Sequence, residues 1–231
     1  TGYQALNYNT TGFYNTATGS EALYSNTTGN YNTATGSEAL YYNTTGNYNT
    51  ANGWDALHNN TTANHNTAIG HEALYSNTTG YDNTATGLGA LRYNTTGNYN
   101  TASGWKALYT NSTGNYNTAI GMNSLLSNNT GNANTAIGFQ ALMSNFAGLN
   151  NVATGYEALK YNNSGSANNA YGHGALYQCG GTGNGGYGEE ANPTTLSGWN
   201  NIGIGYHTLG AIDASGLRIL GNQIGYDNIA M

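Results

Sequence analysis

Hydrophobic and polar positions along this chain recur with a period of 17 residues. An Asn, a tripeptide centred on Ala and a Gly return without insertion or deletion from Asn15 to Asn168, as in NTATGSEALYYNTTGNY at Asn32–Tyr48. A register this strict is typical of stacked, near-identical structural layers. Positions within each repeat are numbered 1 to 17 from that Asn.

Three positions of the repeat hardly vary. Position 5 is Gly from Gly2 to Gly172, position 9 is Leu from Leu6 to Leu176, and position 8 is Ala or Ser. A stacked repeat keeps constant those residues that pack against their own copies in the layers before and after. These columns therefore predict the interior of the stack.

The pattern within one repeat predicts three short elements. Positions 1 to 5 alternate around an invariant Ala and predict a short strand, which Gly at position 5 ends. Positions 6 to 12, for example Ser20–Asn26, predict one to two helical turns, with Ser20 as a cap and Glu21 in the first turn. Asn-Thr-Thr-Gly at positions 12 to 15 is turn chemistry. The fold class is therefore mainly β, with short helical turns.

Each repeat offers little apolar surface to a core. Burial of apolar surface stabilises by about 25 cal/mol per Å², and each repeat has only one Leu, two Ala and one further apolar residue to bury. This small gain must offset the entropy lost when the whole repeat becomes ordered. We therefore expect lateral association to bury the Ala and Leu columns against other chains. Three chains around a common axis are the expected assembly.

The run NTAIG-x-x-AL, seen as NTAIGHEAL at Asn66–Leu74 and NTAIGFQAL at Asn134–Leu142, resembles the repeats of trimeric bacterial and phage fibre adhesins. The resemblance is to the heads of trimeric autotransporter adhesins and to the tail-fibre-like mosaic adhesive trimers of predatory bacteria. The resemblance covers residues 1 to about 179 and implies a β-roll or solenoid-like fibre, an intertwined or side-by-side homotrimer, and an extracellular or cell-surface location. The period departs from that of autotransporter heads, whose repeats are commonly shorter.

The regular pattern ends near residue 180. GGTGNGGYGEEANP at Gly180–Pro193 predicts a loop, and one divergent repeat, NIGIGYHTL, returns at Asn201. We divide the chain into a repeat shaft or head, 1–179, and an irregular C-terminal cap or tip, 180–231. Because Thr1 falls inside a repeat, we expect that the sequence belongs to a longer protein.

Composition excludes several partners. With four basic and ten acidic side chains, the net charge is −6, so there is no basic patch for nucleic acid. No apolar run is long enough to insert in a membrane. Cys179 is the only cysteine and stands at position 12, where earlier repeats have Asn, so we interpret it as a small buried substitute.

Catalytic and metal chemistry have no clear candidate in the sequence. The five His (His58, His65, His71, His173 and His207) fall at positions 10, 17, 6, 6 and 7, without the spacing of a zinc site. Five of the ten acids stand at position 7, where helix-start electrostatics explain them, and a literal GxGxxG at Gly181–Gly186 lacks its flanking strand and helix. We therefore predict no enzyme, no cofactor and no metal site.

Aromatic residues form columns at positions 6, 10 and 17. Stacked rings could bind sugars, but packing of each ring on its copies in neighbouring layers explains the Tyr columns more simply. Aromatics outside the regular repeats are better ligand candidates, because regular packing does not account for them. The predicted ligand-binding residues are Tyr187, Glu189, Glu190, Trp199 and His207.

These observations favour a non-enzymatic trimeric fibre or adhesin module. Its C-terminal tip would recognise a cell-surface glycan or an envelope component. An ice-binding solenoid is the first alternative, suggested by Thr-Ala-Thr at Thr16–Thr18 and Thr33–Thr35, although position 4 becomes Asn52 and Ile69 in later repeats. A tail-fibre polysaccharide depolymerase is the second, and it would require paired carboxylates in a groove.

Overall fold

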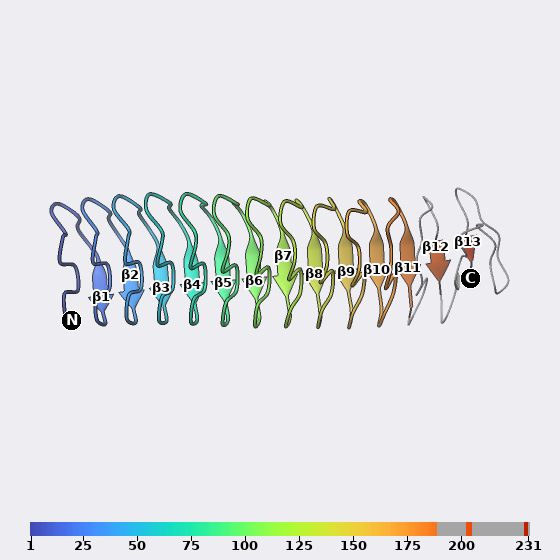
Figure 1. The fold of residues 1–231 in the computed structure, drawn as a ribbon, viewed down its shortest axis with the longest axis horizontal. Helices are drawn as coiled ribbons and strands as arrows, with labels where there is room; N and C mark the ends of the chain where they lie inside the picture. Colours follow the sequence, from blue (N-terminus) through green and yellow to red (C-terminus); the bar gives the residue numbers. More distant parts are fainter. Residues whose placement is uncertain (189–201, 205–228, 231) are drawn as a thin grey trace. The chain divides into compact units, whose positions relative to one another are not determined.

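The structure is a computed structural model that describes residues 1–188, 202–204 and 229–230. The chain divides into an N-terminal part, Thr1–Tyr116, and a C-terminal part, Asn117–Met231. Each part is a parallel β-solenoid, in which every coil contributes one short strand to a sheet (Figure 1). The solenoid with a 17-residue period is thus confirmed.

The strands of the N-terminal part are β1 (Thr16–Thr18), β2 (Thr33–Thr35), β3 (Thr50–Asn52), β4 (Thr67–Ile69), β5 (Thr84–Thr86) and β6 (Thr101–Ser103). Those of the C-terminal part are β7 (Thr118–Ile120), β8 (Thr135–Ile137), β9 (Val152–Thr154), β10 (Asn169–Tyr171), β11 (Gly185–Tyr187), β12 (Ile202–Ile204) and β13 (Ile229–Ala230).

Strand pairing follows the repeat. Within each part, every strand pairs in parallel with the next one along the chain, and identical positions face each other, as Ala17 faces Ala34 in β1 and β2. The central Ala of each strand from β1 to β10 is buried. Because successive side chains of a strand point to opposite faces, positions 2 and 4 point outward. The strand predicted at these positions is confirmed.

The core consists of columns of identical side chains. Leu23 and its copies up to Leu176 are completely buried, as are most of the Ala residues at positions 3 and 8. This burial occurs inside a single chain. The argument that a trimer is needed to cover the Leu and Ala columns therefore no longer holds.

Two columns of Asn complete the core, at positions 1 and 12. Asn26, Asn43 and Asn60 at position 12 are fully buried, and so are Asn32 and Asn49 at position 1. Their side-chain amides form hydrogen bonds between one coil and the next. For example, the side-chain Oδ1 of Asn32 accepts from the backbone N–H of Asn49 at 2.9 Å. Polar groups can occupy a core in this way because each amide finds its copy as a partner.

The predicted helical turns are wrong: the described residues contain no helix. Positions 7 and 9 instead adopt positive φ, for example 57° at Glu21 and 52° at Leu23. The N–H of Glu21 donates to Tyr3 O of the preceding coil at 2.7 Å, and the N–H of Leu23 donates to Ala39 O of the next coil at 2.9 Å. A left-handed Leu costs about 1–2 kcal/mol. Hydrogen bonds between coils and burial of the Leu side chain offset that cost.

The coil continues past residue 180, where the sequence predicted a loop. β11 pairs with β10, and the partners Asn169 and Gly185 are one residue closer in sequence than in earlier coils. β12 pairs with β11, and β13 with β12. The loop expected at Gly180–Pro193 is therefore wrong for Gly185–Tyr187, and Glu189 to Pro193 lie outside the described residues.

Candidate functional site

Of the five predicted ligand-binding residues, only Tyr187 lies among the described residues. It is the last residue of β11 and occupies position 4 of its repeat, so it belongs to the regular sheet and not to an irregular loop. Its ring remains exposed and stacks on Tyr171 of β10, with centroids 5.4 Å apart and planes at 11°. Glu189, Glu190, Trp199 and His207 fall outside the described residues.

The neighbour of Tyr187 in the next strand is also exposed and apolar. Ile204 of β12 faces Tyr187 in the sheet register and is 45% exposed. Tyr171, Tyr187 and Ile204 thus project side by side from three consecutive strands. We call these three residues the C-terminal strand patch. Sequence reasoning found Tyr187, but missed the other two, because it looked for ligand-binding residues only in the segment after residue 180 that it expected to be irregular and there favoured aromatic and charged side chains.

The Tyr columns pack on themselves. Tyr31 and Tyr48 at position 17 stack with centroids 4.9 Å apart and planes at 3°, and Tyr24 and Tyr41 at position 10 stack at 4.9 Å and 11°. Packing between coils, the simpler interpretation, is therefore confirmed for these residues.

The outer face of the N-terminal sheet is rich in hydroxyl groups. Position 2 is Thr in all six strands from β1 to β6, and only Thr67 among them is half-buried. Position 4 is Thr in β1, β2 and β5, and Asn52, Ile69 and Ser103 in the others. We call the outward side chains at positions 2 and 4 of β1–β6 the threonine face. No charged residue belongs to it.

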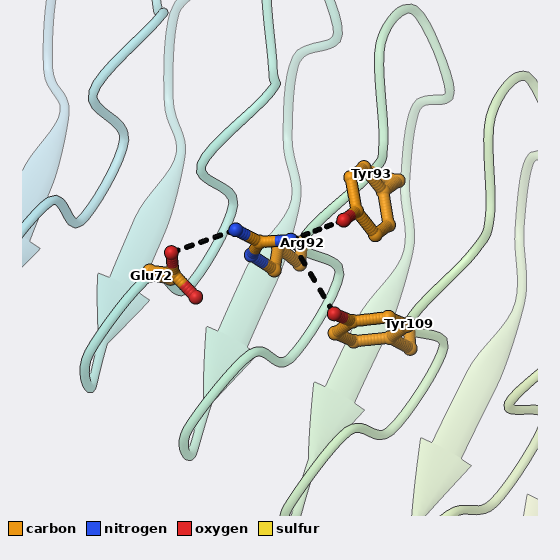
Figure 2. Close-up of polar contacts among 4 residues, drawn as sticks. All are labelled: Glu72, Arg92, Tyr93 and Tyr109. Carbon is orange, nitrogen blue, oxygen red and sulfur yellow. Dashed lines mark hydrogen bonds and ion pairs between the residues drawn. The ribbon is translucent and has the colours of Figure 1, made fainter.

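Arg92 forms the centre of a charged cluster on another segment of the coil. It stands at position 10, where the four preceding repeats have Tyr or His, and its Nη2 donates to Glu72 Oε1 at 2.7 Å. Nη1 donates to the hydroxyls of Tyr93 and Tyr109, the latter at 3.3 Å (Figure 2). The hydrogen bond that Arg92 donates to the Glu72 carboxylate raises the Arg92 pKa above its ordinary value. The guanidinium is therefore already engaged within the chain.

A second cluster joins Glu38, Asp55 and His58 of neighbouring coils. Each residue offers one ligand atom, and these three atoms all lie within 4.8 Å of one another. His58 Nε2 lies 3.2 Å from Glu38 Oε2. Burial, followed by the negative charges of Glu38 and Glu72, raises the pKa of the Asp55 carboxyl, although the nearby His58 and His71 oppose this. Sequence reasoning missed this cluster.

Cys179 is buried, as the sequence predicts. Its Sγ accepts a hydrogen bond from Asn184 Nδ2 at 3.4 Å and lies 3.9 Å from Gly181 O. Burial raises the pKa of the thiol to about 11. Since the thiolate is the reactive form, this environment does not favour a nucleophile.

Comparison of the chain with protein-family models, curated proteins and solved structures finds no match. Within the part of the chain that the structure describes, no helix has the length and apolar character needed to cross a membrane.

Proposed function

We propose that the chain is a non-enzymatic module of a trimeric surface fibre, and that its C-terminal turns recognise a cell-surface glycan or envelope component. The C-terminal strand patch is the observation that carries the proposal. Tyr171, Tyr187 and Ile204 remain 42%, 37% and 45% exposed although their strands are fully paired. Exposed aromatic and aliphatic side chains gathered on a rigid scaffold are typical of recognition surfaces.

The bonding between coils supports a scaffold role. Strands, turns and buried Asn side chains all hydrogen-bond to the preceding or following coil, as in Thr27 N–H to Thr44 O at 2.9 Å. Such bonding fixes the spacing of surface residues along each part of the chain. A binding group on a stiff support keeps its geometry at little entropic cost.

Assembly as a homotrimer follows from the resemblance to fibre adhesins and not from the core. The surface best suited to contact between copies is the outer face of the C-terminal sheet. Ile120 and Ile137 at position 4 are 42% and 39% exposed there. Apolar residues exposed in a row on one sheet face are suited to association.

The proposal can be tested with matched substitutions at position 4. Thr occurs naturally at this position, so Tyr187→Thr and Ile69→Thr should both keep the strand. The intact protein, bound to immobilised glycans and to purified lipopolysaccharide, should lose at least about tenfold in affinity with Tyr187→Thr. Ile69→Thr, at a similarly exposed position 4 of the N-terminal sheet and outside the proposed trimer contact, should keep that affinity. Equal binding by both variants would contradict recognition at the patch.

Two further measurements test the rest of the proposal. Light scattering should give the mass of three chains, and a stable monomer would refute the trimer. The same glycans, analysed for chain length after incubation, should be unchanged. Shortened chains would instead support the alternative of a polysaccharide depolymerase.

A second candidate function, ice binding, is favoured by the threonine face. Its position-2 column is Thr without interruption from Thr16 to Thr101. Neighbouring strands lie about 4.8 Å apart, and alternate residues of one strand about 6.6 Å apart. The Thr hydroxyls and methyls at position 2 thus recur at a regular spacing on an uncharged face, and Thr at position 4 adds to them in β1, β2 and β5. Regularly spaced hydroxyls and methyls suit contact with the ordered water of an ice surface.

Thermal hysteresis distinguishes this candidate. Thr50→Tyr would place a bulky ring in the middle of the face, while Thr45→Tyr makes the same change at an exposed turn position. If the face binds ice, the first variant should lose most of the hysteresis and the second should keep it. Wild-type protein without hysteresis would remove the candidate.

A further inference from the structure

Four consecutive coils of the N-terminal part carry an acidic residue at the same position. They are Glu21, Glu38, Asp55 and Glu72 at position 7. Like charges repeated along a column repel each other, and the repulsion increases where water is excluded. At one end Arg92 pairs with Glu72. In the middle, Glu38 and Asp55 have His58 as their basic neighbour.

His58 is held rigidly in its place. Its ring is only 9% exposed and stacks between Tyr41 and Tyr75, with centroids 5.2 and 5.1 Å away and planes at 11° and 15°. It therefore continues the column of rings at position 10. Stacking fixes the plane of the ring, and the partners of Nδ1 and Nε2 fix the direction in which each nitrogen points.

The hydrogen bond on the other side of the ring determines which nitrogen carries the proton. His58 Nδ1 lies 3.1 Å from Asn59 Oδ1, which can only accept. Nδ1 is therefore the donor, and in the neutral ring the lone pair is on Nε2, which faces Glu38 Oε2 at 3.2 Å. Two acceptors at this distance need a cation between them, either a proton on Nε2 or a metal ion. Metal-binding His residues are oriented in the same way by a second hydrogen bond.

Asp55 supplies a further oxygen that can act as a ligand for a cation. Its Oδ1 is shielded from solvent and has no hydrogen-bond partner among the residues that the structure describes. The Asp55 and Glu38 oxygens and the His58 nitrogen lie within 4.8 Å of one another. Rotation of the Glu38 side chain, which is 39% exposed, can bring its oxygen closer. A buried carboxylate oxygen without a donor is stabilised by a bound cation.

We propose that Glu38, Asp55 and His58 form a binding site for a zinc-type divalent transition-metal ion. One imidazole and two carboxylates are a donor set that Zn²⁺ accepts, with bonds of about 2.0–2.2 Å and a fourth position open to water. Mg²⁺ and Ca²⁺ prefer oxygen ligands alone. The ion would neutralise the acidic column at the point where no Arg or Lys does so. This proposal is independent of the proposed recognition function.

The test is calorimetric titration of the EDTA-treated intact chain with ZnCl₂. We expect Zn²⁺ to bind the wild type saturably, and we expect no binding of Mg²⁺ or Ca²⁺ at the same concentration. His58→Tyr introduces the residue that its column contains at Tyr41 and Tyr75, so the fold should be kept. This variant should lower the Zn²⁺ affinity by more than about 100-fold. Asn59→Ser introduces the residue found at the same repeat position at Ser25 and Ser76, and it should lower the affinity by about tenfold.

The matched control is His65→Tyr. His65 also stacks in an aromatic column, on Tyr48 at 5.0 Å, and Tyr is the common residue at its position. This variant should bind Zn²⁺ as the wild type does. Circular dichroism melting without metal checks that all variants fold. Absence of Zn²⁺ binding in the wild type, or undiminished binding in His58→Tyr, would overturn the proposal.

Discussion

Asn43 donates a hydrogen bond from Nδ2 to Oδ1 of Asn26, its copy one coil earlier, at 2.8 Å. The same Nδ2 donates to Gly46 O at 3.0 Å, which closes the turn of its own coil. Both residues are completely buried. Each amide thus joins one coil to the next and also fixes the turn of its own coil. No apolar side chain of the same size could replace these two contacts.

The first prediction concerns this ladder. Asn60→Ala removes the bonds to Asn43 Oδ1 at 2.8 Å and to Ala63 O at 3.1 Å, and it removes the acceptor of Asn77 Nδ2. Each buried group left without a partner costs about 1–3 kcal/mol. We expect the free energy of unfolding in urea to fall by about 3–5 kcal/mol. Thr62→Ala, at an exposed neighbouring position, should change it by less than about 0.5 kcal/mol.

The period and the apolar columns could be predicted because identity at fixed spacing is itself the signal of stacking. The Asn ladders could not, because Asn in Asn-Thr-Thr-Gly is also ordinary turn chemistry. Asn43 plays both roles. Only the structure shows that its amide points inward, where a copy in the next coil satisfies it.

The helical turns were predicted wrongly because Ser-Glu-Ala-Leu has good local helix chemistry. Contacts between coils override that preference, as the left-handed Glu21 and Leu23 show. The cluster of Glu38, Asp55 and His58 was missed for a related reason. Glu38 and Asp55 share position 7 in neighbouring coils, whereas His58 stands at position 10. Columns considered one at a time do not reveal neighbours from another column that the stacking of coils creates.

The second prediction concerns Gly at position 5. Gly53 has φ +142°, and a Cβ built there would lie 2.5 Å from Gly70 O in the next coil. Gly53→Ala must separate two backbones, and we expect a loss of more than about 3 kcal/mol in free energy of unfolding. Gly89→Ala is the comparison, since its Cβ would first meet the Tyr109 side chain at 3.2 Å. It should cost only about 1 kcal/mol. Equal losses would refute a backbone clash.

The third prediction concerns the left-handed residue at position 7. Gln140 has φ +53°, and Gly takes the same position at Gly89 and Gly174. Gly adopts positive φ without the strain that a Cβ causes. Gln140→Gly should therefore be more stable than Gln140→Ala by about 1 kcal/mol in urea unfolding. Greater stability of the Ala variant would mean that the strain is relieved in some other way.

The last prediction concerns the pH dependence that Cys179 contributes. The folded chain raises the pKa of its thiol from 9.0 to about 11 by burial, so folding favours the neutral thiol. The contribution is fully present below about pH 9, and it is lost as the pH rises through about 11. A shift of this size corresponds to about 2–3 kcal/mol.

Cys179→Ala provides the reference, because Tyr residues titrate in the same range in both proteins. The difference in free energy of unfolding between wild type and variant should decrease by about 2–3 kcal/mol between about pH 9 and about pH 11. At about pH 8 the folded wild type should react with a thiol reagent at least tenfold more slowly than the urea-unfolded chain, because burial limits both thiolate formation and access. A pH-independent difference, together with equal reaction rates, would show that the thiol is not in the buried environment between Asn184 and Gly181.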